Sequence, residues 1–324
     1  MHRATTLNPV ALEVIEGLKS TPKKISSKYF YDREGSRIFQ KIMDMPEYYL
    51  TRSEAEIFES YKGKLASLFC SDCCSVDLVE LGAGDGAKTQ ILIEELLSRE
   101  TKLKYIPIDI SEDAVVQLAG AMKLKFPTLH LEPRIGDYFH LIEDLSREYP
   151  NRKVLMFLGS NLGNFTYQQS ISFISGLRRV MSEDDLFFIG LDLKKDPEII
   201  RKAYDDPHGY TRDFNLNLLH RFNRELGADF DPEAFIHAPR YDANSGTASS
   251  SLVSKKDQQV YFKEGQETIR FFEGESIHTE ISQKYDLESI EKMAGASGFE
   301  VSRTFFDSKR YCVSSLWMVA QPVS

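Results

Sequence analysis

The sequence predicts an α/β fold, a doubly wound and largely parallel sheet with an inserted α+β segment. Three observations support this prediction. Residues 77–89 pass from an apolar run into a glycine-rich turn and then into a helical run, which is the first unit of such a sheet. Segments of strand and helix character then alternate as far as residue 191. This alternation stops at residues 196–284, where helices are followed by short strands.

The amino-acid composition indicates an ordinary globular protein. The 324 residues suffice for one large or two ordinary domains, and a hydrophobic share of 42% is ordinary for a globular protein. A net charge of −9 disfavours nonspecific binding to nucleic acid or anionic membranes. No apolar run is long enough to span a bilayer, and the first residues lack the apolar core of a signal peptide. We therefore expect a cytoplasmic monomer.

The glycine turn follows a short apolar strand. Gly82, Gly84 and Gly86 let the backbone turn sharply and approach a ligand without a Cβ in the way. Glu80 precedes the first glycine, and a helix is predicted over residues 91–97. This G-x-G-x-G spacing after an acidic residue resembles the first motif of S-adenosylmethionine (SAM) methyltransferases. The alternative is a tight turn that binds nothing.

Two further strand ends carry acidic residues. The apolar strand at 105–110 contains Asp109 at its end, where doubly wound sheets bind ribose hydroxyls. Ser111 is a plausible N-cap for a helix at 112–125. Asp137 and Tyr138 follow a third strand, near 129–133, where an acid and an aromatic residue that bind adenine are expected. The alternative for Asp137 is a turn residue.

An aromatic segment at residues 27–52 follows an amphipathic helix at 8–19. It contains Tyr31, Phe39 and Tyr48, together with a glycine and a proline. Aromatic density alone usually indicates core packing. Because tyrosines on irregular backbone often contact ligands, we expect part of this segment to bind the substrate.

The loop after the strand at 153–158 is the next candidate. It runs from Gly159 to Asn164 and is rich in glycine and asparagine. Ligands lie outside the carboxyl ends of parallel strands, so this loop is expected to face the molecule that is methylated. The alternative is a solvent loop. Helices at 53–70, 138–146 and 167–181 and a strand at 185–191 complete the alternating part.

The inserted segment is expected to bind the substrate. Helices are predicted at 197–204 and 212–227, strands at 258–262 and 268–272, and a turn or mobile loop at 245–251. Glu280 and Ser282 are two residues apart, which places them on one face of an extended chain. A helix at 286–298 and an antiparallel pair at 301–306 and 314–320 then close the sheet.

The cysteines offer one weak metal signal. Cys70 and Cys73 have the C-x-x-C spacing, but no second pair follows at a ligand spacing and no H-x-x-x-H pair occurs. We therefore expect free thiols and no metal site.

Three long motifs resemble one family. They are the run from Lys28 to Arg52, the loop from Leu158 to Phe165, and the segment from Ile277 to Tyr285. Together they are similar to the histidine-specific, SAM-dependent methyltransferases, over essentially the whole chain. That resemblance implies three methylations of the α-amino group of L-histidine, giving hercynine, in ergothioneine biosynthesis. It also implies a Rossmann-like SAM-binding domain at 56–195 plus 285–324 and a substrate domain at 1–55 plus 196–284.

The resemblance also implies roles for individual residues. Asn164 and Tyr204 would hold the substrate carboxylate, and Tyr31 and Gly159 would lie near its amino group. The residues that would hold the imidazole are Tyr48, Glu280 and Ser282, with Phe39 nearby. Those that would bind SAM are Gly82, Gly84, Lys88, Asp109, Asp137 and Tyr138.

One position departs from the family pattern. Ser250 stands where members specific for histidine often carry a methionine, and a smaller residue enlarges the pocket. Glu280 and Ser282 match the two nitrogens of an imidazole. Two alternatives remain at this point: a SAM-dependent N-methyltransferase for another aromatic amino acid such as tryptophan, and a non-catalytic SAM-binding protein.

Overall fold

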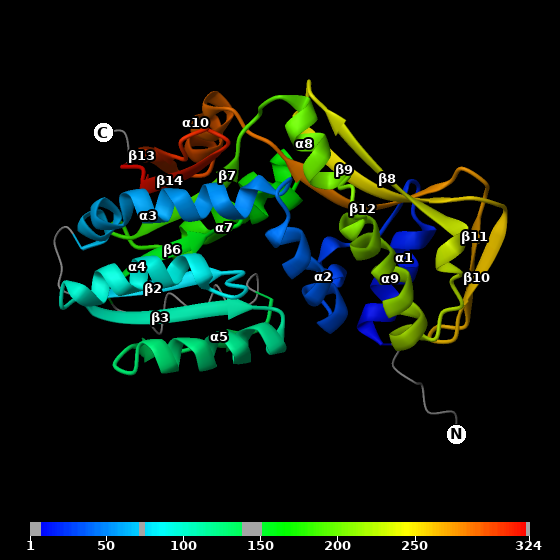
Figure 1. Ribbon diagram of the computed structural model, residues 1–324, viewed down its shortest axis with the longest axis horizontal. Helices are drawn as coiled ribbons and strands as arrows, with labels where there is room; N and C mark the ends of the chain where they lie inside the picture. Colours follow the sequence, from blue (N-terminus) through cyan, green and yellow to red (C-terminus); the bar gives the residue numbers. More distant parts are fainter. Residues whose placement is uncertain (1–7, 71–74, 138–150, 322–324) are drawn as a thin grey trace. The chain divides into compact units, whose positions relative to one another are not determined.

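The computed structural model describes residues 8–70, 75–137 and 151–321 and divides the chain into two compact units (Figure 1). Unit 1 comprises Met1–Tyr48 and Asp196–Ser282, and unit 2 comprises Tyr49–Lys195 and Gln283–Ser324. The first boundary falls at 48/49 rather than at the expected 55/56. The reason is that helix α3, Tyr49–Phe69, is continuous, so its first turn belongs with the rest of it.

Unit 2 is built on an eight-stranded sheet with the order β13-β14-β7-β6-β2-β3-β4, in which β5 also pairs with β3. Its parallel pairs are β2 with β3 and β6, β3 with β4 and β5, and β6 with β7. Strand β14 is antiparallel to β7 and to β13, which confirms the predicted closing pair and the fold class. The strands are β2 (Ser75–Leu81), β3 (Lys102–Asp109), β4 (His130–Leu131), β5 (Arg134–Ile135), β6 (Arg152–Phe157), β7 (Leu186–Asp192), β13 (Phe299–Phe306) and β14 (Cys312–Val319).

Helices cover both faces of this sheet. Successive side chains of a strand point to opposite faces of the sheet, so Phe187 lies on one face and Phe188 on the other. Phe187 contacts Trp317 and lies in a core cluster with residues of α7 (Tyr167–Val180) and α10 (Leu287–Ala296). Phe188 contacts Phe58 and Phe69 of α3. Helices α4 (Ala87–Ser98) and α5 (Glu112–Lys125) follow β2 and β3, while the predicted helix at 138–146 lies outside the described residues.

A buried ion cluster lies where the chain enters and leaves unit 2. Asp192, at the end of β7, is 0% exposed and accepts a hydrogen bond from the hydroxyl of Tyr49 at 2.8 Å. The ammonium groups of Lys284, at 2.8 Å, and Lys195 pair with the same carboxylate. These lysines lower the pKa of Asp192 despite its burial. The cluster therefore joins the three chain segments next to the unit boundaries.

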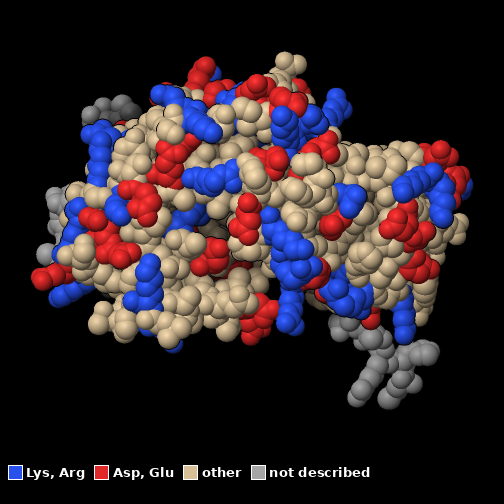
Figure 2. All heavy atoms as spheres, viewed as in Figure 1, with Lys and Arg blue, Asp and Glu red and all other residues tan. Residues whose placement is uncertain are grey.

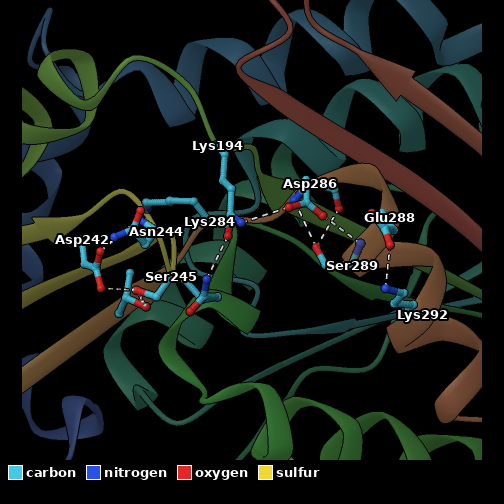
Figure 3. Close-up of polar contacts among 11 residues, drawn as sticks. Lys194, Asp242, Asn244, Ser245, Lys284, Asp286, Glu288, Ser289 and Lys292 are labelled. Carbon is cyan, nitrogen blue, oxygen red and sulfur yellow. Dashed lines mark hydrogen bonds and ion pairs between the residues drawn. The ribbon is translucent and has the colours of Figure 1, made fainter.

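Helix α10 begins at an aspartate cap, shown in Figure 3. The carboxylate of Asp286 accepts the backbone N–H of Ser289 at 2.9 Å, and the Ser289 hydroxyl lies 3.1 Å from the backbone nitrogen of Asp286. Lys194 donates to the same carboxylate at 2.9 Å. These contacts, the backbone hydrogen bond first, lower the pKa of Asp286 to about 2. The capping box fixes where the last helix starts.

Unit 1 packs helices against a four-stranded sheet with the order β1-β12-β9-β8. A two-stranded hairpin, β10-β11, completes its strands. Residues of helices, strands and hairpin share one hydrophobic cluster, which is the core of this unit. The elements are α1 (Pro9–Lys19), β1 (Lys23–Lys24), α2 (Arg33–Asp44), α8 (Pro197–Tyr204), α9 (Tyr210–Leu226), β8 (Phe235–Asp242), β9 (Thr247–Ser254), β10 (Gln258–Phe262), β11 (Glu267–Phe271) and β12 (Ser276–Gln283).

One prediction for unit 1 was wrong. Most of residues 245–251, expected to be a turn or mobile loop, belong to strand β9, whose even-numbered residues from Ala248 to Ser254 are buried. The small side chains conceal this alternation in the sequence. The aromatic segment contains helix α2, which the sequence analysis did not predict, while Tyr31 and Tyr48 lie outside helices. Gly35 lies in that helix where a Cβ would stand 1.8 Å from the carbonyl oxygen of Phe30, so the glycine permits a close approach.

Charged side chains of both signs are interspersed over the face drawn in Figure 2. The acidic excess of the chain is therefore not gathered into one patch on this face. Of the helices in the part of the chain that is described, none combines the length and the apolar character needed to cross a bilayer.

Candidate functional site

The sheet of unit 2 contains a crossing point between β2 and β6. The chain runs from β2 to β3 on one side and later returns to β6 on the other. Ligands of doubly wound sheets bind outside the carboxyl ends of the strands at such a point. The glycine turn follows β2 and the loop 159–164 follows β6, so both predicted segments lie at this edge.

Backbone geometry explains the glycines of the turn. Gly82 has φ of +70°, and a Cβ there would stand 3.0 Å from the side-chain nitrogen of Asn161. Gly84 has φ of +56°, and no described atom lies within 4 Å of the place of its Cβ. Gly82 therefore permits the loop after β6 to approach closely, and Gly84 borders open space.

Asp109 is fixed by two backbone groups. One carboxylate oxygen accepts the N–H of Gly84 at 2.9 Å, and the other accepts the N–H of Ser111 at 2.9 Å. Each carboxylate oxygen has a further lone pair for an outside donor. Asp137 follows β5, and the neighbouring Gly136 donates its N–H to the carbonyl of Asp109 at 2.9 Å. The two acids thus follow adjacent strands, while Tyr138 lies outside the described residues.

Two buried glutamates support this edge: Glu80, which the sequence analysis named as the acidic residue before the glycine turn, and Glu54, which it did not single out. Glu80 is 2% exposed and accepts hydrogen bonds from Thr89 at 2.8 Å and from the Tyr105 hydroxyl. Burial raises its pKa to about 7, and the two hydrogen bonds limit the rise. Glu54 of α3 pairs with Lys88 and accepts the N–H of Gly159. Lys88 therefore does not point freely into solvent.

The loop after β6 has an unusual backbone. Gly159 has φ of +72° and Ser160 has φ of +55°, and a short 3-10 helix, η2 (Asn161–Asn164), follows. Gly163 is buried, and Asn164 is partly exposed. Tyr285 donates its hydroxyl to the carbonyl of Leu162 at 3.3 Å, which holds the middle of the loop.

Unit 1 gathers the predicted aromatic residues. The ring of Phe39 lies 5.6 Å from that of Tyr31 and 6.2 Å from that of Tyr48, measured between centroids. Phe214 of α9, which the sequence analysis did not single out, lies beside Phe39 with ring centroids 5.6 Å apart. Tyr31 and Phe39 come from one segment, so their proximity could be expected, whereas the partner on α9 could not.

The polar residues of unit 1 lie on neighbouring elements. Tyr204, at the end of α8, donates its hydroxyl to Ser282 of β12 at 2.7 Å. Glu280 stands two residues earlier on the same strand and is partly exposed. Ser250 of β9 is 1% exposed, and its hydroxyl lies 3.2 Å from Nε2 of His237. Burial lowers the pKa of His237 to about 4, so this imidazole is neutral at physiological pH.

The predicted residues that the structure describes are divided between the two units. Unit 2 holds Gly82, Gly84, Lys88, Asp109, Asp137, Gly159 and Asn164. Unit 1 holds Tyr31, Phe39, Tyr48, Tyr204, Ser250, Glu280 and Ser282. Cys70 and Cys312 are free thiols, Cys73 lies outside the described residues, and no cluster suited to a metal occurs among the residues described.

Comparison with known proteins identifies the family. A family model described as "Histidine-specific methyltransferase, SAM-dependent" matches residues 10–319. Histidine N-alpha-methyltransferase from Mycobacterium tuberculosis is 34% identical, over 91% of this chain and 90% of its own length. N-methyltransferase fsqC from Aspergillus fumigatus is 28% identical, over 93% of this chain and 81% of its own. Ergothioneine biosynthesis protein 1 from Schizosaccharomyces pombe is 27% identical, over 77% of this chain and 34% of its own. The chain belongs to the histidine-specific, SAM-dependent methyltransferase family.

Proposed function

We propose that this protein transfers methyl groups from SAM to the α-amino nitrogen of L-histidine, up to the trimethylated product hercynine. The family match over residues 10–319 carries the proposal, because it extends over segments of both units. Hercynine formation would supply ergothioneine biosynthesis, a role named in one relative. We further propose a cytoplasmic monomer that acts on a small molecule rather than on nucleic acid, which a net charge of −9 supports.

The residues at the crossing point fit SAM. Asp109 keeps a lone pair on each carboxylate oxygen, which suits two ribose hydroxyls. The open space beside Gly84 suits a ligand close to the backbone. In this proposal unit 2 binds SAM through Gly82, Gly84, Lys88, Asp109, Asp137 and Tyr138.

The residues that we assign to the substrate are those that the family resemblance implies. Asn164 and Tyr204 would hold the carboxylate of the amino acid, and Glu280 and Ser282 would hold its imidazole, beside Tyr48 and Phe39. The hydrogen bond of Tyr204 to Ser282 supports this grouping, since it brings residues of the two subsites together. Unit 1 would therefore determine which amino-acid side chain is bound.

When bound, SAM supplies an electrophilic methyl group on a sulfonium. The protein must present a neutral amine to it, and α-amino groups titrate near ~8, so a modest shift is enough. The N–H of Gly159 is bound to Glu54, and the carbonyl oxygen of Gly159 would accept an amine N–H. Tyr31 would pass the proton to water. Gly159 and Gly163 carry no side chain, which leaves room for methyl groups on the nitrogen.

A second candidate substrate is another aromatic amino acid. The similarity to a relative named only as an N-methyltransferase supports it, as does the small, buried Ser250. The third reading, a SAM-binding protein without catalysis, is less well supported because the family is one of enzymes.

The decisive experiment is mass spectrometry of L-histidine after incubation with SAM and the protein, beside parallel samples of tryptophan and tyrosine. We expect histidine to gain up to three methyl groups and the other two amino acids to gain few or none. Methylation of tryptophan alone would support the second candidate. SAM binding without methylation of any of the three would contradict the proposal.

A further inference from the structure

Glu54 joins three segments at the crossing point of unit 2. Its side chain is 6% exposed, and its two oxygens lie 2.9 and 3.0 Å from the backbone nitrogen of Gly159. The ammonium of Lys88, in the first turn of α4, pairs with the same carboxylate. Glu54 thus binds a group from the glycine-turn side and a group from the loop after β6.

The sheet is adapted to this carboxylate. Gly190 lies inside β7, where a Cβ would stand 2.0 Å from Oε1 of Glu54. Its backbone does not lie in the left-handed region, so conformational freedom does not explain the glycine. The explanation is space: any larger residue at 190 would displace the carboxylate of Glu54.

The two groups that Glu54 binds border the predicted SAM site. A Cβ on Gly159 would stand 3.7 Å from Nζ of Lys88, so the ammonium lies beside the turn after β6. The Lys88 side chain is 21% exposed, so part of it reaches solvent. Ligands bind at this edge of a doubly wound sheet. A charge here would therefore act on a bound ligand.

Lys88 and Glu54 form a pair whose opposite charges offset each other. Burial opposes the charged form of Lys88, but the charge of Glu54 and its hydrogen bond outweigh burial and raise the pKa of Lys88. The lysine is therefore a cation whose charge is offset by a buried anion. SAM carries a positive sulfonium, whereas S-adenosylhomocysteine, the product of methyl transfer, has a neutral sulfur. An unpaired Lys88 would repel the first ligand and not the second.

We propose that Glu54 is a positioning residue of the cofactor site, which holds Lys88 and Gly159 and supplies the counter-charge that lets the site bind the sulfonium. The inference rests on the proposed SAM site and not on which amino acid is methylated. It predicts that Glu54 sets the relative affinity for SAM and S-adenosylhomocysteine.

The test is calorimetric measurement of both dissociation constants at pH 6.5, far below the ordinary lysine pKa of about 10.4. Glu54→Gln removes the negative charge and keeps a hydrogen-bonding side chain. At an effective dielectric constant of ~20, an uncompensated charge within about 10 Å should weaken SAM binding by at least about tenfold relative to S-adenosylhomocysteine. Glu59→Gln is the matched control, since Glu59 pairs with Lys62 on the exposed side of the same helix, and should leave the ratio unchanged.

Two further variants separate charge from structure. Lys88→Met leaves Glu54 without its lysine and should shift the ratio toward SAM, a result that does not depend on whether the Glu54 variant folds. The double variant Glu54→Gln/Lys88→Met restores neutrality and should return the ratio to the wild-type value. Equal losses for both ligands in Glu54→Gln, or no shift in Lys88→Met, would overturn the proposal. A wild-type protein that binds neither ligand would overturn the SAM site itself, whereas failure to methylate histidine would leave the charge test intact.

Discussion

Buried charged side chains gather in unit 2, whereas unit 1 buries mainly neutral polar groups. Among the described residues, unit 2 encloses Glu54, Glu80, Asp192 and Lys284, each with named hydrogen-bond or ion-pair partners. The buried polar residues of unit 1 are, apart from Asp206, amides and hydroxyls: Thr211, Asn215, Asn217, Ser250, Ser254, Thr279 and Ser282. The same chain therefore uses two ways of holding polar groups inside.

The difference matches the two ligands that we propose. A buried charge is stable only with a partner, and it then fixes its neighbours firmly and acts on ligand charge. Buried hydroxyls and amides are held by hydrogen bonds, such as that from Thr279 to Asn215 at 2.6 Å. They distinguish ligands by shape and by the position of hydrogen-bond donors rather than by charge. Unit 2 is thus suited to a cationic cofactor and unit 1 to a neutral side chain.

The largest expected effect tests the charged interior of unit 2. Asp192→Asn leaves Lys284 and Lys195 without their counter-charge, and breaking a buried ion pair costs about 3–5 kcal/mol. Chemical denaturation should show a loss of unfolding free energy in this range. Asp206→Asn is the comparison in unit 1, because Asp206 accepts the backbone N–H groups of Tyr210 and Thr211. Its loss should be about 1–2 kcal/mol, and equal losses would contradict the contrast between the units.

The next effect concerns the cofactor. Asp109→Ala removes the acceptor that we assign to the ribose hydroxyls, and such bonds to a charged group contribute about 1.5–3 kcal/mol. We expect SAM to bind about ten- to a hundredfold more weakly by calorimetry. Glu112→Ala, an exposed change on the following helix, is the control. Unchanged affinity in Asp109→Ala would place the ribose elsewhere.

The third effect concerns recognition of the substrate side chain by unit 1. Glu280→Ala would leave the imidazole donor without its acceptor, a loss of about 1–3 kcal/mol. The Michaelis constant for histidine should rise by about tenfold or more, and the efficiency ratio of histidine to tryptophan should fall. SAM affinity should not change. Glu273→Ala, exposed in the turn before β12, is the control, and a ratio that does not move would show that Glu280 does not read the ring.

The sequence predicted the residues at the cofactor edge of the sheet better than the buried residues that hold them in place. Gly82 and Asp109 follow recognisable strands, and parallel strands end at one edge, so their proximity follows from the topology. Glu54 could not be assigned in this way, because its partner Gly159 is 105 residues away and nothing near Glu54 in the chain marks a contact. Only the packing of α3 on the sheet brings them together.

Unit 1 was harder to predict for a different reason. Strand β9 is made of serines and other small residues, so its alternation of burial is invisible on a hydrophobicity scale. His237 and Ser250 meet only because β8 and β9 pair, and the sequence showed neither strand. Helices α1, α8 and α9 and the hairpin β10-β11 were predicted closely, since their apolar periodicity is strong, whereas α2 was not predicted.

The smallest effect tests the neutral interior of unit 1 through pH. The folded-state pKa of His237, about 4, lies below the ordinary value of 6.5, chiefly because of burial. Between these values the unfolded chain binds more protons, so stability falls as pH decreases from 6.5 to 4. The full shift corresponds to ~3 kcal/mol, and partial exposure should reduce it to about 1–2 kcal/mol. His237→Asn should remove this part of the pH dependence of the unfolding free energy.

A second variant identifies the cause of that pH dependence. Ser250→Ala removes the hydroxyl that lies 3.2 Å from Nε2 of His237 but leaves the other surroundings that bury the imidazole in place. If burial keeps the ring neutral, the loss of stability from pH 6.5 to 4 should persist in this variant. Urea titrations at several pH values in this range give the slope for each protein. A slope that vanishes with Ser250→Ala would mean that the hydrogen bond, not burial, holds His237 neutral, and that unit 1 depends on specific polar pairing as much as unit 2 does.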